Sequence, residues 1–184
     1  MLKVRILPTL LFKDVGLVKG IGFDSWRRVG SAMQAVKVYN MREVDELVFF
    51  DISATPNVRG PDLQQIEDLA RECFMPMTVG GGVRSVNDIR DLLMVGADKV
   101  AINTAAIETP DLIRQGAERF GVQCIVVGID VKRTTDGWEV YSHCGKRPTG
   151  LDPVEHAKQA EALGAGEIIL TSIDRDGTMQ GYDV

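Results

Sequence analysis

Histidine and cysteine are scarce in this sequence, and their scarcity excludes several kinds of site. The chain of 184 residues has two histidines and three cysteines. Two histidines, His143 and His156, are too few for a multi-histidine metal centre. The cysteines, Cys73, Cys124 and Cys144, are odd in number and irregularly spaced, so they indicate neither a disulfide framework nor a zinc site. We therefore expect no metal, no other cofactor and a reducing, cytoplasmic location.

An excess of positive charge and long apolar runs are also lacking. The net charge is −5, from 21 Lys and Arg against 26 Asp and Glu, and no basic run is present. This argues against nucleic acid as the main partner. No apolar stretch approaches the roughly 20 residues of a membrane span, and the N-terminus lacks a small-residue cleavage site. With 45% hydrophobic residues, the chain can build one sizeable core, and we expect one domain over 1–184.

Glycine, in contrast, is concentrated at one informative place, the stretch FMPMTVGGGVRSVND over 74–88. A short apolar run bounded by three glycines is typical of a buried strand followed by a sharp turn. Ser85 and Asp88 then predict a capping box that opens a helix. Glycine N–H groups and the partial positive charge of a helix N-terminus together favour phosphate binding. A tight connection without any ligand would use the same residues.

The rest of the chain alternates strands and helices. We expect strands at 5–11, 46–52, 99–102, 124–129 and 167–171, besides the one in the glycine-rich stretch. We expect helices near 31–42, from Pro61, from Ser85 to Gly96, from Pro110 (capped by Thr109) to Gly121, and from Asp152-Pro153 to Gly164. Residues 12–30 read as a long polar loop, and Asp136-Gly137 as a hairpin turn. Such alternation indicates parallel strands with helical crossovers, in a doubly wound sheet or a closed barrel.

An internal repeat favours the barrel. Residues 46–49 and 167–170 each begin with glutamate and reach a glycine, Gly60 or Gly181, with the same spacing. Leu11-Phe12-Lys13 similarly aligns with Asp130-Val131-Lys132. The offsets are 121 residues (46 to 167) and 119 residues (11 to 130). Two such halves make a (βα)₈ barrel of roughly 250 residues, so about six of the eight strand–helix units are present.

Several segments carry a family resemblance. They are DELVFFDISA, MTVGGGVRS, GADKVAINTAAI, VVGIDVKR and GAGEIILTSIDRDGTMQGYD. Over its whole length the chain resembles the cyclase subunit of imidazole glycerol phosphate synthase, the HisF family. The resemblance implies an α/β fold, a (βα)₈ TIM barrel truncated here to about six units, with two more units expected after Val184. It also implies ammonia delivered by a glutamine amidotransferase (glutaminase) partner, and a substrate with a phosphate at each end.

The resemblance also implies a set of site residues. One phosphate site matches Gly81, Gly82, Asn103 and Thr104, and part of another matches Asp176 and Gly177, although both sets are also good turn chemistry. Asp130, at a strand end beside a phosphate-rich ligand, can have a raised pKa and act as an acid or base. The alternative for Asp130 is a loop carboxylate bonded to nearby amides. Four charged residues that open strands match an ammonia gate at the N-terminal mouth of the barrel, opposite the phosphate sites. They are Arg5, Glu46, Lys99 and Glu167. They could equally form a solvated rim or ion pairs that fix strand register.

One position departs from the family pattern. The cyclase works with two aspartates, one in each half-barrel, and Leu11 occupies the position equivalent to Asp130 in the first half. Leucine cannot transfer a proton. The strand Pro8-Thr9-Leu10-Leu11 and the segment VYNMREVDELVFFDI resemble a paralogous branch that forms acetamidino sugars of bacterial surface polysaccharide. Three functions stay open: amination of a nucleotide-linked sugar, cyclisation in histidine biosynthesis, and a non-catalytic barrel that only docks a glutaminase.

Overall fold

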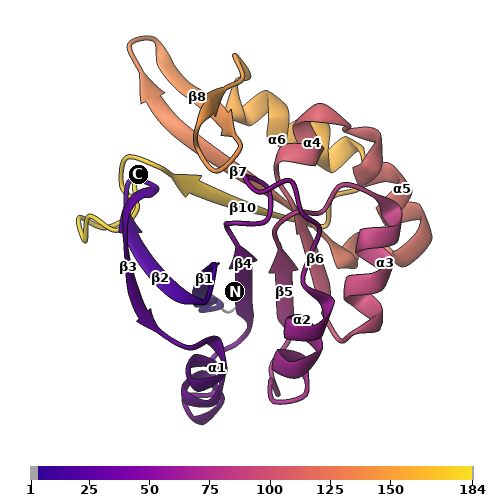
Figure 1. Ribbon diagram of the computed structural model, residues 1–184. Coiled ribbons are helices and arrows are strands. Elements are labelled where there is room, and N and C mark those ends of the chain that lie inside the picture. The colour runs from indigo at the N-terminus through magenta and orange to yellow at the C-terminus, as the bar shows by residue number, and fades with distance from the viewer. Residues whose placement is uncertain (1–3, 184) are drawn as a thin grey trace.

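Parallel strands form the body of the sheet in the computed structural model, which describes residues 4–183. In spatial order they are β1 (Thr9–Lys13), β4 (Leu47–Asp51), β5 (Met77–Gly80), β6 (Lys99–Ile102), β7 (Ile125–Thr134) and β10 (Glu167–Ser172). The helices are α1 (Ala32–Met41), α2 (Leu63–Ala70), α3 (Val86–Met94), α4 (Thr104–Glu108), α5 (Asp111–Phe120) and α6 (Pro153–Ala162), with a short 3₁₀ turn η1 (Val122–Cys124). Figure 1 shows the sheet curving, with helices along its outer side. The predicted α/β fold of a TIM-like barrel is confirmed, and its sheet is not closed within the described residues.

Local signals account for most helix boundaries. The predicted capping box is present, with the Ser85 hydroxyl and the Asp88 carboxylate each accepting from the other's backbone N–H. Asp152 caps α6, and Pro153 occupies its first turn. Two predicted starts were wrong: α2 is capped by Asp62 instead of opening at Pro61, and α5 begins after Pro110 without a side-chain cap. In both cases the helix begins within two residues of the proline, so the error concerns only the exact helix boundary.

The predicted polar loop over 12–30 was wrong, because this segment forms an antiparallel hairpin. Its strands are β2 (Gly16–Ile21) and β3 (Asp24–Gly30), and β2 pairs with the end of β1. Positive φ angles at Asp14, Gly22 and Phe23 make the two tight turns. β3 is exposed along nearly all of its length, so the apolar alternation that predicts a strand is missing.

The second predicted hairpin is present. β7 continues past Asp130 to Thr134 and returns as β8 (Gly137–Ser142), with the turn at the expected position. A two-residue strand, β9 (Arg147–Pro148), extends this edge. Both hairpins therefore leave the parallel sheet at the carboxyl ends of its strands.

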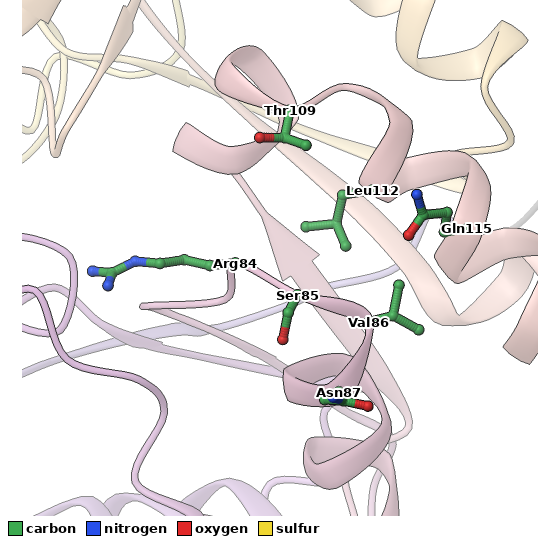
Figure 2. Close-up of a pocket in the computed structure, with 7 residues that line it drawn as sticks. All are labelled: Arg84, Ser85, Val86, Asn87, Thr109, Leu112 and Gln115. Atoms are coloured by element: carbon green, nitrogen blue, oxygen red, sulfur yellow. The ribbon is translucent and has the colours of Figure 1, made fainter.

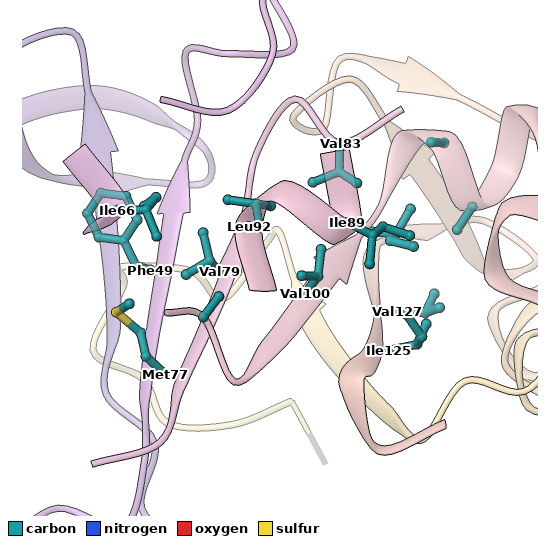
Figure 3. Packing of buried hydrophobic residues seen from close by; sticks show 14 of the residues in the cluster. Phe49, Ile66, Met77, Val79, Val83, Ile89, Leu92, Val100, Ile125 and Val127 are labelled. Atoms are coloured by element: carbon teal, nitrogen blue, oxygen red, sulfur yellow. The ribbon is translucent and has the colours of Figure 1, made fainter. Parts of the chain in front are cut away.

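The sheet has two faces of different character. Its outer face packs against the helices, and Figure 3 shows Phe49, Met77, Val79 and Val100 meeting Leu92 of α3 and its neighbours. Directly paired residues of neighbouring strands share a face, so the opposite face carries Leu11, Phe50, Gly80 and Ala101. A side chain on Gly80 would lie 2.9 Å from the Phe50 ring, so Phe50 fills the space above this glycine.

His156 of α6 gives a prediction about acid stability. It is 4% exposed, and neither ring nitrogen has a hydrogen-bond partner among the described residues. Burial lowers the pKa of His156 below 6.5, so stability is lost as pH falls through 6.5 towards the folded-state pKa. We expect His156→Leu to reduce the loss of unfolding free energy between pH 8 and pH 5, measured by urea unfolding.

Gln159→Leu is the matched control, because Gln159 is exposed on the same helix. Its pH dependence should equal that of the wild type. An unchanged pH dependence in His156→Leu would contradict the assignment of the acid sensitivity to this imidazole.

Candidate functional site

The carboxyl ends of the parallel strands bring several predicted site residues together on one rim. The Nδ2 of Asn103, just after β6, donates to Oδ2 of Asp130 in β7 over 2.8 Å. Thr104 follows Asn103, and its Oγ1 accepts from the backbone N–H of His143 over 3.1 Å. Asp176, in the loop after β10, lies close enough to Asp130 for its charge to affect the pKa of that carboxyl. This gathering is what parallel strands of a barrel produce at their carboxyl ends.

Asp130 has the electrostatics of an acid–base group. Burial, reinforced by the negative charge of Asp176, raises the pKa of Asp130 from 3.8 to about 6. Hydrogen bonds from Asn103 and Thr171 act in the opposite direction and limit the rise. A carboxyl with this pKa is mostly ionised at neutral pH and still exchanges its proton readily. The Oδ1 atom of Asn103 is buried beside it without a partner among the described residues.

The glycines at the end of β5 are required by the fold. A side chain on Gly81 would clash with the backbone carbonyl of Asp51, and one on Gly82 would lie 2.5 Å from the carbonyl of Arg59. Both glycines have positive φ angles, +115° and +73°. The loop after β4 therefore packs directly on this turn. Among the described residues, the backbone N–H groups of Gly82 and Thr104 donate no backbone hydrogen bond outside the helices and strands. Both N–H groups can therefore bind an anion.

Asp176 and Gly177 make structural contacts. Asp176 accepts from the N–H of Gly22 through its carbonyl (2.9 Å) and from the N–H of Phe23 through its carboxylate (3.4 Å). Gly177 packs so closely against the carbonyl of Gly20 that no side chain would fit. The loop after β10 is thus fastened to the tip of the β2–β3 hairpin. Burial raises the pKa of Asp176, with the Phe23 hydrogen bond opposing the rise.

Sequence reasoning missed an ion pair on the same rim. Asp51 ends β4 and is 6% exposed, and its carboxylate accepts from Nη2 of Arg59 over 2.5 Å. Ser53 donates to the same carboxylate from its hydroxyl (2.7 Å) and its backbone N–H (2.9 Å). The Asp51 carboxylate could have been predicted from the sequence, because Asp51 ends an apolar run just as Asp130 follows one. The backbone carbonyl of Arg59 lies against Gly82, so the ion pair borders the glycine turn after β5.

Cys144 is a second residue that sequence reasoning did not place here. Burial, together with the negative charges of Asp130 and Asp51, raises the pKa of the Cys144 thiol to about 11. The thiol is therefore neutral at physiological pH, and it contacts the carbonyl oxygen of Ile52 at 3.5 Å. Its position is set by a turn in which His143, Cys144 and Gly145 all have positive φ angles. Cys144 thus contributes a neutral, polarisable surface between the two aspartates.

The four residues predicted as an ammonia gate form one network at the opposite mouth. Lys99 Nζ contacts Oε2 of Glu46 and Oε1 of Glu167, each at 2.9 Å. Arg5 joins the same two carboxylates at 3.2 and 3.1 Å. Thr78 donates to Glu46 over 2.7 Å. One detail was wrong: Arg5 precedes β1 by four residues instead of opening it, and only its long side chain reaches the ring.

Burial of the ring is uneven. Glu46 is 2% exposed and Lys99 15%, whereas Arg5 is 50% exposed. Burial acts to lower the pKa of Lys99, but hydrogen bonds from its ammonium to Glu46 and Glu167 raise it above 10.5. The pKa of Glu167 moves below 4.5, because contacts with Lys99 and Arg5 outweigh its burial. The network is therefore charged throughout the neutral pH range.

A shallow pocket of about 280 Å³ lies between the start of α3 and the α4–α5 turn (Figure 2). It is lined by Arg84, Ser85, Val86, Asn87, Thr109, Leu112 and Gln115. The capping box already engages the first N–H groups of α3. No predicted site residue lines this pocket, and we give it no role.

Within residues 4–183, no group of three or more His, Cys, Asp or Glu side chains is arranged to hold a metal ion. None of the described helices combines the length and apolar character needed to cross a bilayer.

The fold and the rim together define a class of protein. It is an α/β barrel protein whose polar groups gather at the carboxyl ends of the strands, where enzymes of this architecture carry their active sites. The chain belongs to the family described as "Histidine biosynthesis protein", whose model matches residues 5–184. The match confirms a HisF-like member of a family of barrel enzymes.

Proposed function

We propose that this chain is a synthase subunit that uses ammonia from a partner glutamine amidotransferase to aminate a phosphorylated or nucleotide-linked sugar. The product would be an acetamidino sugar of surface polysaccharide, made in the cytoplasm. The observation that carries the proposal is the asymmetry of the rim. Asp130 is a partly buried carboxyl with a pKa of about 6, and the equivalent position in the first half-barrel is Leu11.

The chemistry of amidine formation suits one acid–base group. Ammonia adds to the carbonyl carbon of an acetamido group, and the oxygen departs as water. Protons must move from the attacking nitrogen to the departing oxygen, and one carboxyl that exchanges its proton near neutrality can carry them in sequence. Asn103, held by its hydrogen bond to Asp130, has a buried Oδ1 that can accept from the substrate. Gly81, Gly82 and Thr104 would bind a substrate phosphate, and Asp176 with Gly177 part of a second.

The ammonia route supports the partner in this proposal. The charged ring of Glu46, Lys99, Glu167 and Arg5 would lie under the docked glutaminase and gate the entry of ammonia. Between the ring and the rim, the inner face of the sheet carries small or apolar residues, Gly80 and Ala101 among them. Such a path suits neutral ammonia, because ammonium would lose its hydration there.

A second candidate is the cyclase of histidine biosynthesis, which the description of the family favours. Leu11 argues against it, since a cooperating pair of acid–base groups usually loses orders of magnitude in rate when one is absent. A third candidate, a non-catalytic barrel that regulates a glutaminase, would leave the hydrogen-bonded Asp130–Asn103 pair without a role.

A steady-state assay with an ammonium salt distinguishes the candidates. We expect amination of a nucleotide-linked acetamido sugar by the assembled protein and turnover of the histidine precursor at least about 100-fold slower, a conservative estimate for loss of one acid–base group. Comparable turnover of the histidine precursor would contradict our interpretation of Leu11. Absence of turnover with either substrate, alongside an altered glutaminase rate, would favour the regulatory barrel.

A further inference from the structure

The two hairpins at the rim carry lysines in matching positions. Lys13 is the last residue of β1, two beyond Leu11, and Lys132 lies in β7, two beyond Asp130. A spacing of two residues in a strand keeps both side chains on the same face of the sheet. Each lysine therefore extends from the face that carries Leu11 or Asp130, one step farther out along its hairpin. Figure 1 shows the hairpins leaving the sheet at different places around this rim.

Each lysine lies over an aromatic ring of the next strand or the one beyond it. Lys13 Nζ is 5.9 Å from the ring centroid of Trp26 in β3, and Lys132 Nζ is 6.0 Å from that of Tyr141 in β8. Trp26 can lie flat on the hairpin because its neighbour is Gly20, where a Cβ would come within 2.7 Å of the indole. The aromatic rings thus hold both ammonium groups at the rim.

Neither Lys13 nor Lys132 has a carboxylate within ion-pair distance over residues 4–183. Glu139 pairs with Lys132 across the strands, but its carboxylate accepts from the N–H of Gly150 over 2.7 Å. Asp51 is already neutralised by Arg59. Two ammonium groups that rest on aromatic faces can turn towards a multiply charged anion at little cost.

We propose that Lys13 and Lys132 bind the phosphate or diphosphate group of the substrate from two sides of the rim, with Trp26 and Tyr141 as positioning residues. The inference rests on the proposed function only in taking the substrate to be anionic. It adds an anion position built from hairpin side chains, apart from the backbone turn at Gly82. Lysine suits this task as a mobile point charge that can follow a flexible diphosphate.

Fluorescence provides the direct test, since the chain has two tryptophans. In a Trp138→Phe background, Trp26 is the one emitter, and binding of an anion by Lys13 changes its surroundings. We expect inorganic pyrophosphate and uridine diphosphate to change this emission saturably. Lys13→Met and Lys132→Met should each weaken binding about tenfold, the equivalent of losing one charge-assisted contact of about 1.4 kcal/mol.

Two further variants separate a specific contact from general charge and from folding. Lys158→Met on α6 is the charge-matched control, because Lys158 is exposed and pairs only with Glu155 among the described residues. It should bind pyrophosphate as the wild type does. Calorimetry should show that Trp26→Phe retains binding, whereas Trp26→Leu weakens it, because the smaller aromatic ring still positions Lys13.

The outcomes also separate this inference from the proposed function. Wild-type affinity in both lysine variants, an equal loss in Lys158→Met, or no binding to the wild type would overturn the inference. Ammonia-dependent turnover with an unchanged KM in both lysine variants would overturn it while leaving the proposed function intact. Lysine-dependent pyrophosphate binding without any ammonia-dependent turnover would sustain the inference and reject the function.

Discussion

Asp130→Asn is expected to lower ammonia-dependent turnover by about 10²–10⁴-fold, the usual contribution of a positioned acid–base group. Asparagine has the same shape, and its Oδ1 can still accept from Nδ2 of Asn103, so the rim should keep its geometry. What disappears is the ability to exchange a proton. We therefore expect kcat to fall far more than the affinity for substrate changes, in steady-state kinetics with an ammonium salt.

The pH dependence makes this prediction specific to the carboxyl. Turnover of the wild type should rise as pH increases through about 6, where Asp130 ionises, and the residual turnover of Asp130→Asn should lack this limb.

The pH dependence of stability provides an independent test of the Asp130 pKa. The pKa of Asp130 is higher in the folded state than its ordinary value of 3.8, so the folded state binds more protons and loses stability as pH rises towards and through about 6. Asp130→Asn should therefore be stabilised relative to the wild type at pH 8 and much less so at pH 4, measured by urea unfolding.

Asp136→Asn is the matched control, because Asp136 is exposed in the turn of the same hairpin. Its turnover and stability should match those of the wild type at every pH. An Asp130→Asn enzyme with wild-type kcat would rule out acid–base work by this carboxyl and return attention to the regulatory barrel.

The sequence was informative where local and global signals agree. The parallel strands are short apolar runs, and the capping box at Ser85 and Asp88 is a purely local motif. The polar ends of strands were also predictable, because parallel strands deliver their carboxyl ends to one rim. The pairing of Asn103 with Asp130 follows from that geometry alone.

Contacts that depend on packing across the fold could not be predicted from the sequence. β3 shows no apolar alternation because it is an exposed edge strand, so its hairpin read as a loop. The pair between Asp51 and Arg59 arises from the path of one irregular loop, which no periodicity specifies. The sequence predicts ligand approach at the glycines 81 and 82, but the backbone carbonyls of Asp51 and Arg59 already lie against them.

The second large effect is expected at the charged ring. Lys99→Met should reduce the free energy of unfolding by about 3 kcal/mol, the low end of the cost of breaking a buried ion pair. The cost arises because the Glu46 side chain, which is 2% exposed, loses its best-buried partner. Thr78 and the half-exposed Arg5 remain to satisfy it in part. Urea unfolding measures this change.

Lys158→Met provides the comparison, since it breaks a fully exposed pair on α6, and such pairs contribute little to stability. If Lys99→Met were no more destabilised than Lys158→Met, the ring would be a solvated rim, as its charges alone allow.

Turnover measurements distinguish an ammonia gate from a purely structural role of the ring. If the ring only stabilises the fold, its loss lowers turnover with glutamine and with ammonium salt equally, because both depend on the folded fraction. A gate that fails changes the ratio of the two, because external ammonium salt supplies ammonia that need not pass between the partner and Glu46, Lys99 and Glu167. We expect the ratio of glutamine-dependent to ammonium-dependent turnover in Lys99→Met to change at least about tenfold, equivalent to 1.4 kcal/mol on one route alone. An unchanged ratio with lowered stability would assign the ring to strand register and remove the gate from the proposed function.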